Sequence, residues 1–266
     1  MQNKLDQLKR ILDESTYTVA LCGSGMMEEG GFLGIKRQEK AYDIEKRYGV
    51  SPEYLFTCAY FETRPERFFD FYRNELLKEI PGVTDSGRSL AALEKAGKLQ
   101  CIITSNIFEL NQRGGCKNVI NLHGSVYQNK CSHCGKEYSM EYIRDSKSIP
   151  RCEECNSVIR PLVNLFGEML DSQLMTKTTE EISKADTLLV LGTTLESEVF
   201  KQYIRYFEGR NLVLIHKHAH YTDRNADLVF WEDPKNVLVH MVEAAEEKKE
   251  VEEKDEVEEK KEEMQE

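Results

Sequence analysis

The 266-residue sequence lacks the features that would place the chain in a membrane or on nucleic acid. It has no run of about 18 apolar residues, the length that a bilayer-spanning helix needs, so we expect no membrane crossing. The first 14 residues mix charged side chains with Leu and Ile and lack the apolar centre of a secretory signal. No basic cluster is present that would contact a phosphate backbone, so we expect no direct nucleic-acid partner. These absences favour a cytoplasmic protein.

The negative charge is unevenly distributed. The net charge is −11, and residues 246–266 alone carry 12 acidic and 5 basic side chains. This tail has almost no apolar face, so we expect it to be disordered or a lone solvated helix. The rest of the chain is only mildly acidic, which is compatible with a basic peptide as partner. Its composition, 40% hydrophobic and 31% charged, is typical of a globular protein with one large domain and a small insertion.

Short apolar, β-favouring runs alternate with stretches of helical periodicity. The clearest run, 18–22, leads directly into the glycine turn Gly23-Ser24-Gly25. Helical periodicity appears at 65–78 and 176–184. Further strands are expected at 99–104, 187–191, 211–215 and 226–230. This alternation predicts an α/β fold with a Rossmann-like, doubly wound parallel sheet.

Four of the eight cysteines form two close pairs, Cys131-x-x-Cys134 and Cys152-x-x-Cys155, separated by seventeen residues. Each pair can present two thiolates to one tetrahedral zinc ion from a tight turn. Free thiols or a redox pair are the alternative, although a redox CxxC usually occurs singly. With four sulfur ligands the zinc would be structural and would leave no position open for water. The polar segment 127–163 around these cysteines is predicted to be an inserted zinc-binding module.

Three further motifs remain ambiguous when considered separately. The turn Gly23-Ser24-Gly25 lacks the full GxGxxG spacing, so a structural turn is about as plausible as a nucleotide site. Gly192-Thr193-Thr194, after an expected strand, could contact a ligand or cap a helix. His123 has the right side chain for a general base near neutral pH, yet a lone histidine is more often structural.

Taken together and in order, the motifs resemble the sirtuin family of NAD-dependent protein deacylases. The resemblance covers roughly residues 5–245 and adds Gln112-Arg113-Gly114-Gly115 and the stretch Arg160 to Glu168 to the motifs above. It implies a Rossmann-like NAD-binding domain from 1–126 and 164–245, interrupted by the zinc module at 127–163. It also implies that a helical segment at 28–75 covers the cofactor.

The resemblance assigns roles to individual residues. His123 would be the catalytic base that takes a proton from a ribose hydroxyl, and Asn106 would position the nicotinamide ribose and a water molecule. An acylated-lysine peptide would pair with the segment that contains Val163, Asn164 and Phe166, mainly through backbone hydrogen bonds. Cys131, Cys134, Cys152 and Cys155 would hold zinc. The residues expected to bind NAD are Gly23, Ser24, Gly25, Met27, Lys36, Ser105, Asn106, Ile107, Gly192, Thr193, Thr194 and His216.

Several positions depart from the family pattern. By ungapped alignment, Ile35 replaces the aromatic residue that screens the reactive ribose, and Lys36 replaces an arginine, although a one-residue slip would bring in Arg37. Phe108 replaces the acid that holds the nicotinamide amide, so nicotinamide should be bound less well. We therefore expect an NAD-dependent lysine deacylase that transfers the acyl group to ADP-ribose. The alternatives are a protein ADP-ribosyltransferase or NAD hydrolase, or a catalytically weak module that binds NAD or ADP-ribose.

Overall fold

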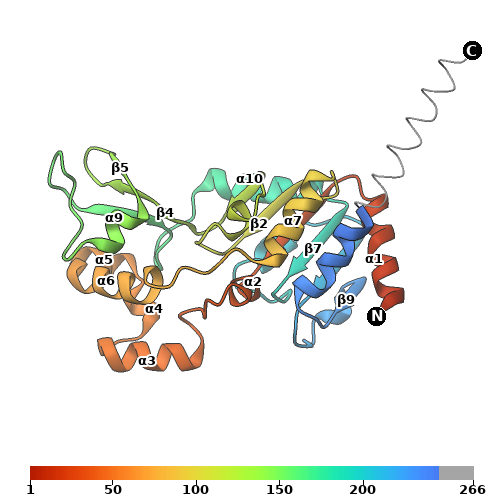
Figure 1. The fold of residues 1–266 in the computed structure, drawn as a ribbon, viewed down its shortest axis with the longest axis horizontal. Coiled ribbons are helices and arrows are strands. Elements are labelled where there is room, and N and C mark those ends of the chain that lie inside the picture. The colour runs from red at the N-terminus through yellow and green to blue at the C-terminus, as the bar shows by residue number, and fades with distance from the viewer. Residues whose placement is uncertain (246–266) are drawn as a thin grey trace, which may run out of the picture.

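A computed structural model describes residues 1–245; the tail predicted to be disordered, 246–266, lies outside the described residues. A six-stranded, all-parallel sheet forms the centre of the larger of two lobes (Figure 1). Its strand order is β3-β2-β1-β7-β8-β9. The strands are β1 (Thr18–Cys22), β2 (Cys101–Thr104), β3 (Val119–Asn121), β7 (Thr187–Leu191), β8 (Asn211–Ile215) and β9 (Leu228–Phe230). The predicted doubly wound α/β fold is confirmed.

The central strands match the sequence expectation most closely. Strands β1, β7 and β8 have the predicted bounds, whereas β2 and β9 each begin two residues later than expected. All five residues of β1 and of β7 are buried, as both faces of a parallel sheet are covered. Strand β3 was not predicted, because three residues are too few to show a pattern.

Helices cover both faces of the sheet. On one face, α1 (Gln2–Glu14) and α7 (Asp85–Lys95) pack together with the chain around Val237 against alternate residues of β1, including Ala20. On the other face, α10 (Ser172–Lys184) and α11 (Lys201–Ile204) pack against residues such as Leu21. Helix α1 has apolar residues at helical spacing, and full burial of one such leucine, Leu8, stabilises the fold by roughly 1.5–3 kcal/mol.

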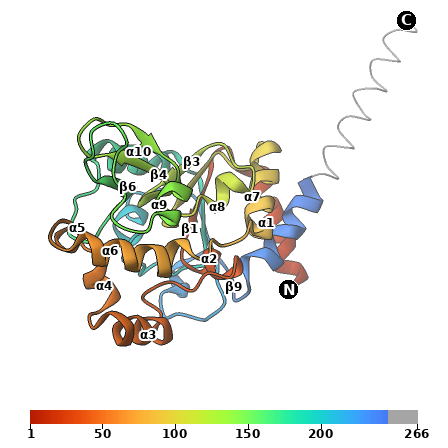
Figure 2. The ribbon, with the colours of Figure 1, turned by 60° about the vertical axis from the view of Figure 1, so that its left-hand side comes forward.

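The smaller lobe combines a helical part and a three-stranded antiparallel sheet of order β5-β4-β6 (Figure 2). The sheet comprises β4 (Gly124–Cys131), β5 (Glu137–Tyr138) and β6 (Ile159–Val163), with α9 (Met140–Asp145) beside it. Strand β4 therefore begins before the boundary at 127 expected for the zinc module. The helices are α3 (Gln38–Tyr48), α4 (Pro52–Leu55), α5 (Cys58–Thr63), α6 (Pro65–Phe71) and the π-helix η1 (Tyr72–Leu77).

One hydrophobic core joins the helical part to the zinc module. The fully buried side chains Phe68 and Tyr72 belong to the same cluster as Val126, Ile143 and the buried cysteine Cys152. The two parts, which the sequence suggested as separate units, therefore share their interior.

Short elements complete the fold. Helix α2 (Gly25–Glu29) follows β1, α8 (Leu110–Arg113) follows β2, and η2 (Asp223–Asn225) lies between β8 and β9. Among the helices of residues 1–245, none is long and apolar enough to span a membrane.

Candidate active site between the two lobes

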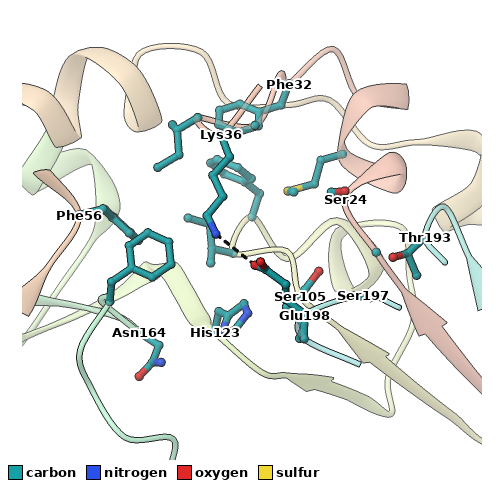
Figure 3. Close-up of a pocket in the computed structure, with 18 of the residues that line it drawn as sticks. Ser24, Phe32, Lys36, Phe56, Ser105, His123, Asn164, Thr193, Ser197 and Glu198 are labelled. Carbon is teal, nitrogen blue, oxygen red and sulfur yellow. Dashed lines mark hydrogen bonds and ion pairs between the residues drawn. The ribbon is translucent and has the colours of Figure 1, made fainter. Parts of the chain in front are cut away.

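The site lies where the sheet changes winding direction. Strands β1 and β7 are neighbours, and the chain continues from β1 toward β2 but from β7 toward β8. The turns after these two strands therefore diverge at the carboxyl edge of the sheet, where open α/β sheets bind ligands. A cavity of about 650 Å³ opens there, and residues of both lobes line it (Figure 3). Its size is within the usual range for small-molecule sites.

The two turns pack backbone against backbone. The Gly25 N–H donates to the Gly192 carbonyl at 2.9 Å, and a Cβ atom at position 25 would lie only 2.8 Å from that oxygen. Gly192 itself has a φ of +62°, a conformation that favours glycine. This close approach leaves the intervening Ser24, together with Thr193, on the cavity wall.

His123 occupies the connection between β3 and β4 and lines the cavity. Its carbonyl accepts a hydrogen bond from the Asn164 N–H at 2.9 Å. Burial is the main cause that lowers the pKa of the imidazole, and the charge of Lys36 lowers it further. Within residues 1–245, no hydrogen bond to the imidazole raises this pKa. A lowered pKa favours the neutral ring at pH 7, which is the form that can accept a proton.

Asn106 is turned away from the cavity. Its amide Nδ2 donates to Thr104 Oγ1 at 2.8 Å and to Asn111 Oδ1 at 3.4 Å, and its Oδ1 accepts from the Phe108 N–H at 2.9 Å. The side chain is 1% exposed and is not part of the cavity wall. In this structure the Asn106 side chain holds the loop after β2, and its expected role in positioning the nicotinamide ribose and a water molecule stays a prediction.

Two aromatic rings form part of the wall. Phe32 and Phe108 lie with ring centroids 4.5 Å apart, and both line the cavity. Lys40 Nζ lies 4.8 Å from the centroid of Phe32. The ungapped alignment suggested that the aromatic residue of this loop was lost at Ile35, but Phe32, three residues earlier, supplies a ring. The signal for it was present, since Phe32 stands between Gly31 and Gly34 in the same loop.

Charged side chains also line the cavity, among them Glu28, Lys36, Arg37 and Glu198. Lys36 extends across the cavity toward Glu198, with 3.4 Å between Nζ and Oε2, and His123 lies below the pair (Figure 3). Arg37 forms an ion pair with Glu28, with Nε 2.9 Å from the carboxylate oxygen Oε1. Arg37 was expected here only if the alignment slipped by one residue, and Glu28 and Glu198 were not predicted as site residues, because their pairing depends on how the loops fold.

The segment after β6 has few free backbone donors. The N–H groups of Asn164, Leu165 and Phe166 donate to the His123 carbonyl, to the Glu168 carboxylate and to the Phe56 carbonyl respectively. A peptide cannot pair through these three N–H groups while they are so engaged. Asn164 and Phe166 both line the cavity.

The structure brings most of the predicted site residues to one cavity. The wall includes Gly23, Ser24, Met27, Lys36, Ser105, Ile107, His123, Asn164, Phe166 and Thr193. It does not include Gly25, Asn106, Val163, Gly192, Thr194 or His216. His216 is buried at the end of β8, where its Nε2 lies 3.0 Å from Asp223 Oδ1. Val163 is buried in β6 opposite Gly124 of β4.

The four clustered cysteines converge as the spacing predicted. Their sulfur atoms all lie within 4.8 Å of one another, with 3.3 Å between Cys131 and Cys155 and 3.5 Å between Cys134 and Cys152. A tetrahedral zinc ion with Zn–S bonds of about 2.3 Å requires sulfur atoms about 3.8 Å apart. Small adjustments of the side chains meet that requirement, so the cluster fits a structural zinc ion.

Comparisons with known proteins agree with this geometry. The sequence model of the family described as SIR2, Sir2 family, matches residues 23–199. A protein of Clostridium acetobutylicum named NAD-dependent protein deacetylase is 36% identical over 237 residues, which is 89% of this chain and 97% of the relative. A protein of the same name from Cutibacterium acnes is 39% identical, covering 84% of this chain and 91% of the relative.

Solved structures are similar over nearly the whole fold. A structure described as "The Structural basis of Sirtuin Substrate Affinity" superimposes with a TM-score of 0.80 at 29% identity, covering 89% of this chain and 97% of the other. A structure described as "Sir2-p53 peptide-NAD+" has a TM-score of 0.76 at 28% identity and covers 90% and 97%. The resemblance drawn from the motifs is confirmed, and the chain belongs to the Sir2 family.

Proposed function

We propose that this chain is an NAD-dependent protein-lysine deacetylase with His123 as the catalytic base. The observation that carries the proposal is the position of His123, whose imidazole faces the cavity between residues of the nucleotide side, such as Ser24, and residues of the peptide side, such as Asn164. The names of the similar proteins support it.

NAD is expected at the carboxyl edge of the sheet. The turns Gly23–Gly25 and 192–194 bring backbone close to backbone, and Ser24, Thr193 and Ser105 offer hydroxyl groups to ribose or phosphate oxygens. Met27, Lys36 and Ile107 complete the wall. Three residues that are not in the cavity wall hold the turns and the loop that form it, namely Gly25, Gly192 and Asn106. We propose that Thr194 and His216 contact the adenosine part of NAD.

The chemistry assigned to His123 follows from its protonation state. NAD supplies the reactive ribose carbon, from which nicotinamide leaves and to which the oxygen of the acylated lysine adds. The neutral His123 ring would then accept a proton from a ribose hydroxyl, and the oxygen of that hydroxyl would bond to the acyl carbon. The bond from that carbon to the lysine nitrogen would break, the lysine amine would leave protonated, and a water molecule would complete the products, with the acyl group left on the ribose. The lowered pKa of His123 keeps the ring in its accepting form at neutral pH.

The four cysteines are proposed to hold zinc away from this chemistry. Four sulfur ligands fill a tetrahedral site, so the ion has no position for water or substrate. Cys131 and Cys152 are buried in the core that the zinc module shares with the helical part, so the metal stabilises the wall of the cavity on the peptide side.

The reason for considering NAD hydrolysis or ADP-ribosylation was the apparent loss of an aromatic screen at Ile35. Phe32 and Phe108 both line the cavity, so aromatic cover is present and that reason no longer favours the alternatives.

Eight cysteines without a disulfide are typical of a reducing compartment, and we propose a cytoplasmic location on this ground.

The products test the proposal directly. With NAD and an acetylated peptide, the protein should release nicotinamide, deacetylated peptide and acetyl-ADP-ribose in equal amounts. Free ADP-ribose without peptide deacetylation would indicate NAD hydrolysis instead, and label from NAD on protein would indicate ADP-ribosylation. Calorimetry that shows NAD binding without any turnover would leave only a binding module.

A further inference from the structure

An ammonium group of the protein itself lies near a carboxylate and an aromatic ring, and all three side chains belong to residues that line the cavity. Lys36 Nζ is 3.4 Å from Glu198 Oε2 and 4.8 Å from the ring centroid of Phe166. Lys36 precedes α3, Phe166 follows β6 and Glu198 follows β7, so three separate elements converge on this cation. A carboxylate and an aromatic face together form a favourable environment for a positive charge.

Glu198 and Phe166 are accessible to a molecule that enters the cavity. The Glu198 side chain is 91% exposed, and Phe166 is 38% exposed. Two nearby carboxylates differ from Glu198 in their partners. Glu196 pairs with Lys201, and Glu168 pairs with Arg160. Those two pairs form within single chain segments, whereas Glu198 pairs with a lysine from the opposite side of the cavity.

We propose that Glu198 and Phe166 form a subsite for a lysine or arginine side chain that neighbours the acyl-lysine in the substrate peptide. Lys36 marks the subsite in the free protein. An ion pair this exposed contributes little stability, so an incoming cation can replace Lys36 at small cost. The proposal rests on the deacetylase function proposed above and names the class of peptide that it favours, one with basic residues beside the acylated lysine.

The position of the subsite fits a residue close to the acyl-lysine. Phe166 lies two residues beyond Asn164, whose N–H donates to the His123 carbonyl, and all three residues line one cavity. A cation bound between Phe166 and Glu198 is therefore beside the reaction centre and not on a remote surface. The total charge of −11 includes −7 from residues 246–266, so residues 1–245 carry only −4, a mildly acidic charge that is compatible with the approach of a basic peptide.

Matched peptides test the subsite. A set of acetyl-lysine peptides would carry arginine, glutamine or glutamate at one flanking position at a time, and kcat/KM would be measured at saturating NAD from nicotinamide release. At one or more positions the wild-type protein should prefer arginine over glutamine by about three- to tenfold, an effect that added salt reduces. The preference should disappear in Glu198→Gln. It should increase in Lys36→Met, which removes the internal competitor, and persist in the matched control Glu196→Gln.

Affinity gives a second readout that needs no turnover. The dissociation constants of the same peptides, labelled for fluorescence anisotropy, should show the same ratio in the wild-type protein and lose it in Glu198→Gln. Equal constants for arginine and glutamine peptides at every position, or a preference that survives Glu198→Gln, would overturn the subsite. Failure to release nicotinamide with any acetylated peptide would contradict the proposed function instead, while the affinity ratio would still decide the subsite.

Discussion

The two lobes of the protein are built around different kinds of core. In the larger lobe, a parallel sheet is covered on both faces by helices, and its strands are continuous apolar runs. In the smaller lobe, one core joins aromatic side chains such as Phe68 to the buried cysteines Cys131 and Cys152. The larger lobe therefore owes its structure to backbone pairing and apolar burial, whereas the smaller lobe also depends on a cluster that fits zinc. The cavity lies between them, so each lobe contributes one wall.

Removing zinc should produce the largest difference in stability between the two lobes. A structural zinc site in a small domain is worth on the order of 10 kcal/mol, so chelation or Cys152→Ser should unfold much of the smaller lobe. Hydrogen exchange should become fast in 55–77 and 124–163 while 18–22 and 187–191 stay protected. The control Cys58→Ser, a cysteine outside the cluster, should keep one zinc ion per chain. Simultaneous loss of protection in both lobes would show that the distinction between them is wrong.

Replacing His123, which lies between the lobes, should greatly slow catalysis without affecting the core of either lobe. We expect His123→Ala to lower the rate of deacetylation by about 10²- to 10⁴-fold, because a general base contributes about that much. Zinc content, the free energy of unfolding and the affinity for the acetylated peptide should stay close to wild type. These are checked by single-turnover kinetics, metal analysis, denaturant unfolding and anisotropy. A rate within tenfold of wild type would exclude His123 as the base.

Two glycine substitutions compare the stability of the closely packed turn at Gly25 with that of the open loop at Gly34. In Gly25→Ala the new methyl group would lie 2.8 Å from the Gly192 carbonyl oxygen, so the variant should lose about 1–3 kcal/mol of stability and bind NAD more weakly. In Gly34→Ala nothing lies within 4 Å of the added Cβ, and stability should change by less than about 0.5 kcal/mol. Urea unfolding measures both. Equal losses in the two variants would mean that the two turns do not pack as described.

The sequence was informative where neighbours along the chain decide the structure. Strands β1, β7 and β8 were predicted within their bounds because each is an uninterrupted apolar run. The four cysteines were brought together as predicted because the CxxC spacing reflects the geometry of metal binding. Ten of the predicted site residues, His123 among them, line the cavity.

Contacts between distant segments were not predictable in the same way. The ring of Phe32 and the pair Lys36–Glu198 depend on how a glycine-containing loop folds across the cavity. The orientation of Asn106 depends on hydrogen bonds to Thr104 and Asn111 that a motif cannot reveal. Strand β3 was too short to be recognised. The pattern of apolar residues along the chain indicates which residues are buried. The partners of polar side chains depend on contacts that form only in the folded protein.

The central claim is that a neutral His123, buried between the lobes, accepts the proton, and the pH dependence of kcat/KM tests it most directly. Because burial and the charge of Lys36 both lower the pKa of His123, the ring loses its proton at a lower pH than an exposed histidine. Activity should therefore decline only as the pH falls through a midpoint below about 6.5, and Lys36→Met should move that midpoint upward. A midpoint at or above 6.5 in the wild-type protein, unchanged by Lys36→Met, would contradict the account.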